Sequence, residues 1–256
     1  ALTLLPSHKL LLEGRATEAI KLALAGSFLG LVITIIAAPF IIQITSKLYP
    51  IIKEYIYHIL IVISVLIIWK SKVKKTALTV FLLSGTLGIV TFSLKQLDQP
   101  LFPLLSGLFG ISSLFLSIKN KLKIPEQIKD IKIKISNIKI SKNILSSLIA
   151  SISTSFLPGL TSSHTTTVAS AITEIEDEKD YILINSSIGT ISMFLSIIAL
   201  FSIEKARNGV IVTLSNIMEI SKIHIVYFSA ISLVTAFIAI LLTLRLEKLF
   251  SNYIPK

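Results

Sequence analysis

The chain has 256 residues, of which 53% are hydrophobic and only 15% charged, whereas a soluble domain carries about 25% charged residues, so the composition excludes an ordinary soluble protein. We interpret the net charge of +11 as the lysine excess of cytoplasmic loops in membrane proteins, and we exclude nucleic-acid binding because no basic stretch alternates with aromatic residues that could stack on bases. The lack of cysteine and the scattering of four histidines exclude disulfides and leave no cluster of metal ligands.

Long runs without charged residues follow one another along the chain. A helix that crosses the hydrocarbon core needs about 20 apolar residues, and most of these runs reach or nearly reach that length. The predicted spans are 22–46, 51–69, 76–94, 100–118, 181–203 and 223–244, with an interrupted element at 143–173. We therefore predict an all-α fold. It is a polytopic integral membrane helical bundle with about six spanning helices and an intramembrane hairpin broken at Pro158-Gly159.

The lysines divide the chain into three predicted parts. Residues 1–118 form a first membrane half, which we expect to be incomplete at its N-terminus because the opening residues read like the end of an earlier element. Residues 119–142 form a Lys/Ile-rich cytoplasmic linker whose isoleucine spacing fits both a strand and a helix. Residues 143–256 form a second membrane half that contains the broken helix 143–173.

Topology follows from the positions of the basic residues. The loop 70–75 carries four lysines and the linker carries eight, so both are expected in the cytoplasm. Beyond the linker, the direction of the chain depends on whether 143–173 is a re-entrant hairpin or one broken span. We favour the hairpin, because it returns the basic C-terminal residues Arg245, Lys248 and Lys256 to the cytoplasm.

The interrupted element is the strongest functional feature of the sequence. Residues 143–173 contain no Asp, Glu, Lys or Arg, yet fourteen of these thirty-one residues are Ser or Thr. Pro158 and Gly159 break the helix, and unwound backbone in a membrane is tolerated only where it lines protein or a wet cavity. A helix that starts after the break would offer unpaired amides to an anion. The predicted substrate-binding residues are Pro158, Gly159, Thr161, Ser162, Ser163, His164 and Thr165.

The alternative for these hydroxyls is a proline kink whose Ser and Thr side chains bond back to carbonyls of their own helix. Six hydroxyl residues within 161–167 fit that alternative poorly. For His164, a packing role and a ligand role remain equally open. We expect a coupling Na⁺ or H⁺ to bind at the carbonyls freed near 156–159, and we expect no other cofactor.

Other polar and small residues are weaker candidates. Asn185 and Ser186 lie near the start of 181–203 and are predicted to line the same cavity, because polar residues in a span usually face the bundle interior. The triplet Pro6-Ser7-His8 resembles Pro158-Gly159 with His164 on a smaller scale, so it is a candidate counterpart of the break in a second repeat. The alternative is an ordinary N-terminal turn. Arg15 and Glu18 are expected to pair at the cytoplasmic mouth of the first helix, and Gly26 and Gly30 to mark close helix packing.

Several segments resemble a known family. The run Gly14-Arg15-Ala16-Thr17-Glu18-Ala19, the segment Gly107-Leu108-Phe109-Gly110 and the Leu157-Pro158-Gly159 motif occur in the order found in the large permease subunit of tripartite tricarboxylate transporters (TctA-type), with the short loops of its archaeal branch. The resemblance implies that Pro158 and Gly159 shape a substrate-facing loop. It also implies two partners, a small membrane subunit and an extracytoplasmic binding protein. The family helix after the motif is rich in Gly and Ala, whereas this one is rich in Ser, Thr and His, which leaves the substrate open.

The sequence thus favours a multi-pass permease of the cell membrane that moves a small organic anion, such as a carboxylate, under an ion gradient. No HExxH, GxSxG or intramembrane aspartyl pair is present, so we predict that the protein is not an enzyme. The main alternative is a non-transporting membrane scaffold or assembly subunit. An intramembrane enzyme would need a nucleophile and a base within hydrogen-bond reach, and Ser163 beside His164 is a poor pair because adjacent helix residues do not face each other.

Overall fold

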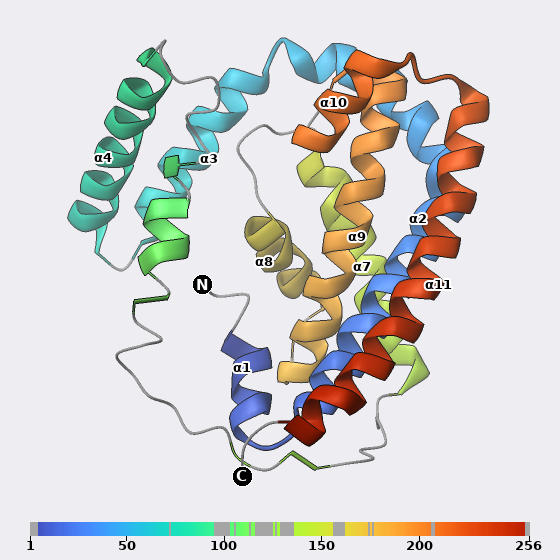
Figure 1. The fold of residues 1–256 in the computed structure, drawn as a ribbon. Helices are drawn as coiled ribbons and strands as arrows, with labels where there is room; N and C mark the ends of the chain where they lie inside the picture. Colours follow the sequence, from blue (N-terminus) through green and yellow to red (C-terminus); the bar gives the residue numbers. More distant parts are fainter. Residues whose placement is uncertain are drawn as a thin grey trace. The chain divides into compact units, whose positions relative to one another are not determined.

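A computed structural model describes residues 5–71, 73–94, 103–104, 106–112, 114–115, 125, 127–128, 136–155, 162–173, 175, 177–205 and 208–253. Within these ranges every regular element is a helix, as predicted (Figure 1). The helices are α1 (Leu5–Leu12), α2 (Ala16–Lys53), α3 (Ile56–Lys70), α4 (Lys74–Ser93), the π-helix η1 (Ser106–Ile111), α7 (Asn137–Ser155), α8 (Ser162–Thr173), α9 (Glu178–Ile203), α10 (Gly209–Ile217) and α11 (Lys222–Tyr253).

Four of these helices, α2, α4, α9 and α11, are long and apolar enough to cross a membrane. The fifteen-residue α3 is apolar but shorter. The predicted span 100–118 is described only in part, at 103–104, 106–112 and 114–115, so the count of six spans stays a prediction. The polytopic helical membrane fold is confirmed.

Helix α2 corrects the predicted boundary between the first two spans. It has 38 residues and continues through Pro39 and Pro50, so Ile51 and Ile52 belong to α2 and not to the following helix. Each proline removes only one backbone hydrogen bond, and helices in membranes tolerate this loss where neighbouring groups restore the bonding. At 1.5 Å per residue, α2 is about 57 Å long, well beyond the ~30 Å hydrocarbon core.

The chain divides into two compact units. The larger unit comprises residues 1–54 and 124–256, and the smaller one residues 55–123. In the smaller unit α3 and α4 pack together, and among the described side chains of α4 only Thr91 is buried. The predicted division at 118 and 142 stays a prediction, although α7 already begins at Asn137, so the last residues of the expected linker are helical.

The central contact of the larger unit joins α2 and α9, which run in the same direction (Figure 1). Near their starts, Gly26 and Gly30 lie directly against the backbone of Leu183 and Ser187. The contact continues into an apolar core in which α2 supplies Leu31, Ala38 and Ile41 and α9 supplies Ile191, Leu195 and Ile198. The predicted packing role of the two glycines is confirmed, since the absence of a Cβ is what permits this approach.

Helices α7 and α8 fold back on each other beside α9 (Figure 1). Asn143, near the start of α7, donates from Nδ2 to Oδ1 of Asp180, at the start of α9, over 2.8 Å. Thr154, near the end of α7, is hydrogen-bonded to Thr165, near the start of α8. The two helices therefore form a hairpin in which α8 returns towards the end where α7 began. Its re-entrant placement in a bilayer stays a prediction.

The turn between α1 and α2 is closed by a residue of the predicted linker. Gly14 adopts a φ of 75°, a left-handed conformation that ends α1. The side chain of Gln127 accepts from the amide of Ala16 at 3.0 Å and donates to the carbonyl of Leu11 at 3.2 Å. Residue 127 thus caps both helices of the turn and ties the linker to the larger unit.

Candidate functional site

The two helices of the hairpin end and begin around the predicted break. Helix α7 ends at Ser155 and α8 begins at Ser162. Pro158, Gly159 and Thr161 lie outside the described residues, so their predicted roles remain predictions. The site is therefore built from the described side chains of α8 and from the α7 and α9 residues that pack against it.

The predicted ligands on α8 differ in how deeply they are buried. Ser162 and His164 are exposed, and Ser163 lies in the first turn between them. Thr165 and Thr166 are buried, with 3% and 0% of their surface exposed. The first amides of α8 have no partner within the helix and carry the positive end of its dipole. The open side of this helix start therefore combines amide donors with the side chains of Ser162 and His164.

Two of the buried hydroxyls of α8 bond back to their own helix, which is the alternative weighed from the sequence. Thr166 donates to the carbonyl of Ser162 at 2.8 Å, and Thr173 donates to that of Ala169 at 3.0 Å. Thr165 pairs with Thr154 at 2.8 Å. Thr154 also lies 2.9 Å from the carbonyl of Ala150, and either threonine can donate in the bond between them. These hydroxyl hydrogens are used inside the protein.

A row of polar side chains runs along the contact of the three helices, and we call it the polar seam. All of its members are buried except Asn185, which is half-buried. Its members are Asn143, Ser147, Ser151 and Thr154 of α7, Thr165 and Thr166 of α8, and Asp180 and Asn185 of α9. The α7 members recur at helical spacing on one face. Ser151 differs from the others, because its hydroxyl is fully buried and has no hydrogen-bond partner.

The predicted α9 ligands take different positions. Oδ1 of Asn185 accepts from the hydroxyl of Thr166 at 3.1 Å, which brings Asn185 beside α8 as expected. The carbonyl of Ser186 instead accepts from the hydroxyl of Ser27 at 3.2 Å, and Thr190 donates to the carbonyl of Ser27 at 2.8 Å. The backbone at Ser186 therefore takes part in the contact with α2.

The triplet Pro6-Ser7-His8 lies in α1, which packs against α2 and α9. Pro6 and Ser7 are half-buried and His8 is exposed. The next residue, Lys9, forms an ion pair with Glu178 at the start of α9. Its pKa is raised, chiefly by this hydrogen bond. The triplet thus lies near a group of charged residues, and its role as a counterpart of the break remains a prediction.

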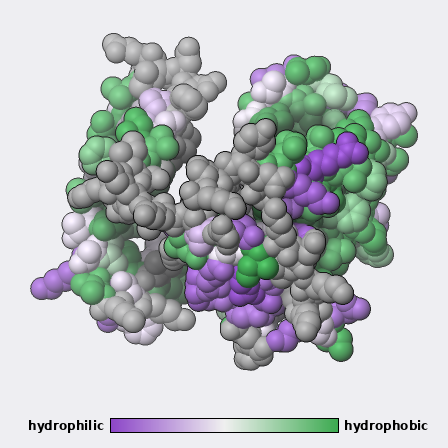
Figure 2. Space-filling view, turned by 60° about the horizontal axis from the view of Figure 1, so that its bottom comes forward, coloured by the Kyte–Doolittle hydropathy of each residue, from purple (hydrophilic) through white to green (hydrophobic). Residues whose placement is uncertain are grey.

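This group, the charged cluster, comprises Lys9, Glu13, Arg15, Glu18, Glu178 and Lys179. Glu18 is only 1% exposed, and its carboxylate accepts from Arg15 at 2.6 Å and from Lys179 at 2.7 Å. The pKa of Arg15 is raised, mainly by its hydrogen bond to Glu18. The predicted pairing of Arg15 with Glu18 is confirmed, whereas Lys179 was missed. Figure 2 looks onto the end that carries α1 and the start of α9, and shows hydrophilic side chains gathered beside largely hydrophobic surface.

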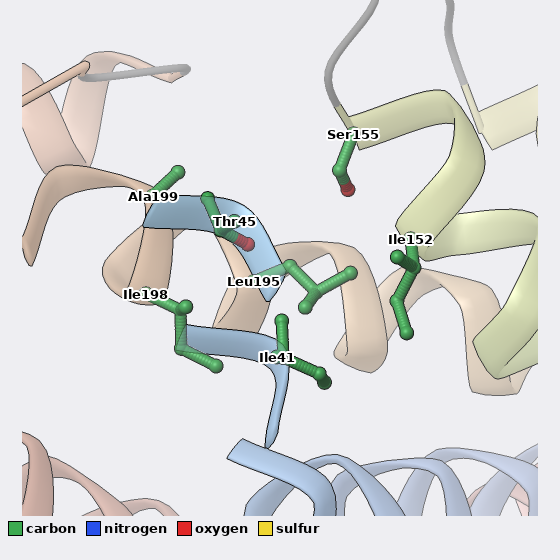
Figure 3. A pocket seen from close by; sticks show the side chains of 7 residues that line it. All are labelled: Ile41, Thr45, Ile152, Ser155, Leu195, Ile198 and Ala199. Atoms are coloured by element: carbon green, nitrogen blue, oxygen red, sulfur yellow. The ribbon is translucent and has the colours of Figure 1, made fainter. Parts of the chain in front are cut away.

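A small pocket lies between α2, α7 and α9, next to the end of α7 (Figure 3). Its lining is mostly apolar, and Thr45 and Ser155 contribute the hydroxyls. The space holds about one water molecule. The pocket therefore marks a place where packing loosens beside the predicted break, and it is too small to hold an organic anion.

Comparison with known proteins shows which family the chain matches. The Tripartite tricarboxylate transporter TctA family matches residues 1–255. An uncharacterized protein of Methanocaldococcus jannaschii is 31% identical over 261 residues, and the alignment covers 100% of this chain and 64% of that relative. The chain thus spans less than two thirds of the relative's length. No solved structure matches the chain.

Proposed function

Because the chain belongs to the tripartite tricarboxylate transporter TctA family, we propose that it forms the substrate-holding part of a membrane permease for a small organic anion, driven by an ion gradient. The protein is a multi-pass membrane protein, and its family consists of transporters and not of enzymes, in agreement with the sequence prediction. We place the substrate at the helix break, on the open side of the start of α8.

The observation that carries this proposal is the start of α8. It offers the exposed side chains of Ser162 and His164 next to the amides of the first turn. Such a helix start favours an anion by about 0.3–1 kcal/mol, and by up to about 2 kcal/mol when partly buried. Residues 143–173 contain no Lys or Arg, so the attraction comes from dipoles and hydrogen bonds. Attraction of this size suits a substrate that must be released again.

The length of the hairpin supports a site within the bilayer. Helix α8 has twelve residues, which corresponds to about 18 Å and is too short to span a hydrocarbon core of about 30 Å. Since α8 runs back towards the start of α9, its own start lies about 18 Å inside the end where α9 begins. We therefore propose a re-entrant hairpin whose tip holds the substrate near the middle of the membrane, as in other transporters with broken helices.

The family also supports partners. TctA proteins work with a substrate-binding protein and with small subunits. We propose that this chain likewise receives its anion from an extracytoplasmic binding protein and associates with a small membrane subunit. Co-purification of two further proteins with the tagged, full-length protein would support the assembly, whereas its isolation as a single polypeptide that transports on its own would contradict it.

The site is tested by the uptake of labelled carboxylates into liposomes that contain the full-length protein. Replacing Ser162, Ser163 and His164 together with alanine should lower the uptake rate by at least about tenfold, which corresponds to the loss of about 1.4 kcal/mol of binding. The melting temperature should stay near that of the wild type, because Ser162 and His164 are exposed. Ser153→Ala is the matched control, since this hydroxyl is exposed and bonds only to its own helix, at the carbonyl of Ile149.

Two results would contradict the proposal in different ways. Uptake by the triple variant at the wild-type rate would reject the assigned site while leaving the permease intact. A folded wild-type protein that takes up no carboxylate, alone or with its partners, would reject the permease and favour a scaffold or assembly subunit.

A further inference from the structure

The unpartnered hydroxyl of Ser151 is the starting point for a second site. Ser151 is 0% exposed, and its Oγ makes no hydrogen bond. A serine inside a helix can normally donate to the carbonyl four residues earlier, as Ser147 does to Asn143 at 2.7 Å. Burying an unsatisfied hydroxyl has a free-energy cost, so such a group in a native protein calls for an explanation. Coordination of a ligand by this hydroxyl oxygen would be such an explanation.

The hydrogen bonds of the polar seam define that chemistry. The hydroxyl hydrogen of Thr166 goes to a helix carbonyl, and the hydroxyls of Thr154 and Thr165 are hydrogen-bonded to each other. What these side chains can still offer is the lone pairs of their oxygens. The seam therefore presents acceptor oxygens, whereas the open start of α8 presents backbone donors. A row of buried acceptor oxygens matches a cation and not an anion.

Ser151 lies between residues of α7 that contact both neighbouring helices. Ser151 lies on the buried face of α7, between Ser147 and Thr154. The hydroxyl of Ser147 lies 3.5 Å from the carbonyl of Ile184 on α9, and Thr154 meets Thr165 on α8. Ser151 therefore lies at the level where α7 faces both neighbours. At that level α8 and α9 meet through Thr166 and Oδ1 of Asn185.

We propose that the polar seam binds a dehydrated monovalent cation of the sodium type, with Oγ of Ser151 as a ligand and with oxygens of Thr154, Thr166 and Asn185 completing the shell. Hard cations prefer oxygen ligands such as hydroxyls and amide carbonyls. These ligands are neutral, which suits a single positive charge. The carboxylate of Asp180, held by Asn143, places one negative charge at the end of the same seam.

This inference deepens the proposed function and rests on it for its biological meaning. The cation would lie on the buried side of the first turns of α8, and the anion at the open start of the same helix. Opposite charges held by one short helix would stabilise each other. This cation site also differs from the one expected from the sequence, which lay at the carbonyls near 156–159. The proposed site is formed by side chains of three described helices.

The test measures the melting temperature of the purified full-length protein without any carboxylate, in sodium, potassium or choline chloride at equal concentration. Sodium at a concentration about 100 times its Kd should raise the melting temperature by about 5 °C relative to choline. In Ser151→Ala this sodium-dependent shift should disappear. In choline, however, the variant should be as stable as the wild type or more stable, because the alanine removes an unsatisfied buried hydroxyl.

Two further variants complete the design. Ser153→Ala, two residues away on the exposed face, should keep the full sodium shift. Ser151→Cys nearly preserves the side-chain shape but replaces a hard oxygen with a soft sulfur, so it should lose the shift even if the alanine variant folds poorly. Equal melting temperatures of the wild type in all three salts would overturn the proposal, as would a sodium shift that persists in both Ser151 variants. Because no carboxylate is present, a sodium shift that requires Ser151 supports this site even if the protein transports no anion.

Discussion

Gly26→Ala is expected to lower the free energy of unfolding by about 1–3 kcal/mol, because a Cβ at this position would overpack the contact between α2 and α9. That Cβ would lie 2.5 Å from the carbonyl oxygen of Leu183. The obstacle is backbone, so no side-chain rotation can relieve it, and the two helices must move apart. Gly26→Val should have a larger effect. Thermal or denaturant unfolding of the detergent-solubilised protein measures both changes.

Gly189→Ala is the matched control for this prediction. Gly189 lies on α9 itself, and a Cβ added there meets nothing within 4 Å. Alanine favours the helix by up to about 1 kcal/mol relative to glycine, so the control should be neutral or stabilising. Similar unfolding curves for Gly26→Ala and Gly189→Ala would show that α2 and α9 do not make this contact.

Removing both cations that contact Glu18 should cost about 3–5 kcal/mol, which is the range for leaving a buried charge without a partner. The double variant Arg15→Met with Lys179→Met leaves the Glu18 carboxylate, 1% exposed, without either donor. Each single variant should cost clearly less than half as much, because the second cation remains in place. Denaturation of the three variants and the wild type gives the coupling between the two cations.

A third substitution distinguishes an unpaired charge from lost packing. Adding Glu18→Gln to the double variant removes the negative charge and should restore part of the lost stability. Arg245→Met, which removes an exposed cation from α11, should change the stability by no more than about 0.5 kcal/mol. Strictly additive costs for Arg15→Met and Lys179→Met would indicate that Glu18 does not depend on the two cations together.

The membrane class, the helix break and the pairing of Arg15 with Glu18 could be predicted because each depends on neighbouring residues. Hydropathy over a single run identifies a span, and spacing within one turn brings Arg15 to Glu18. The contact of Lys179 with Glu18 depends on the parallel register of α2 and α9, which no local pattern contains. The same holds for Gln127, which caps a turn more than a hundred residues earlier.

The division of the hydroxyls of α8 into exposed and buried groups illustrates the same limit. Helical spacing places Ser162 and Thr166 one turn apart, but it does not tell which face meets α7 and α9. The sequence therefore assigned Ser162, Ser163, His164 and Thr165 to one anion site, whereas the structure places Thr165 inside the protein. The spacing of Ser147, Ser151 and Thr154 was visible in the sequence. That these three side chains face another polar helix could not be inferred from the spacing, because it depends on α8 folding back along α7.

The close contact of α2 with α9 limits how the protein can change shape. Backbones that touch at Gly26 and Gly30 cannot slide past each other without collision, and an ion pair between Glu18 and Lys179 joins the starts of the same two helices. The pair should therefore move as one rigid body during an alternating-access cycle, and the hinges should lie elsewhere in the larger unit. Spin labels on the outer surfaces of α2 and α9 should then report a constant distance with and without substrate.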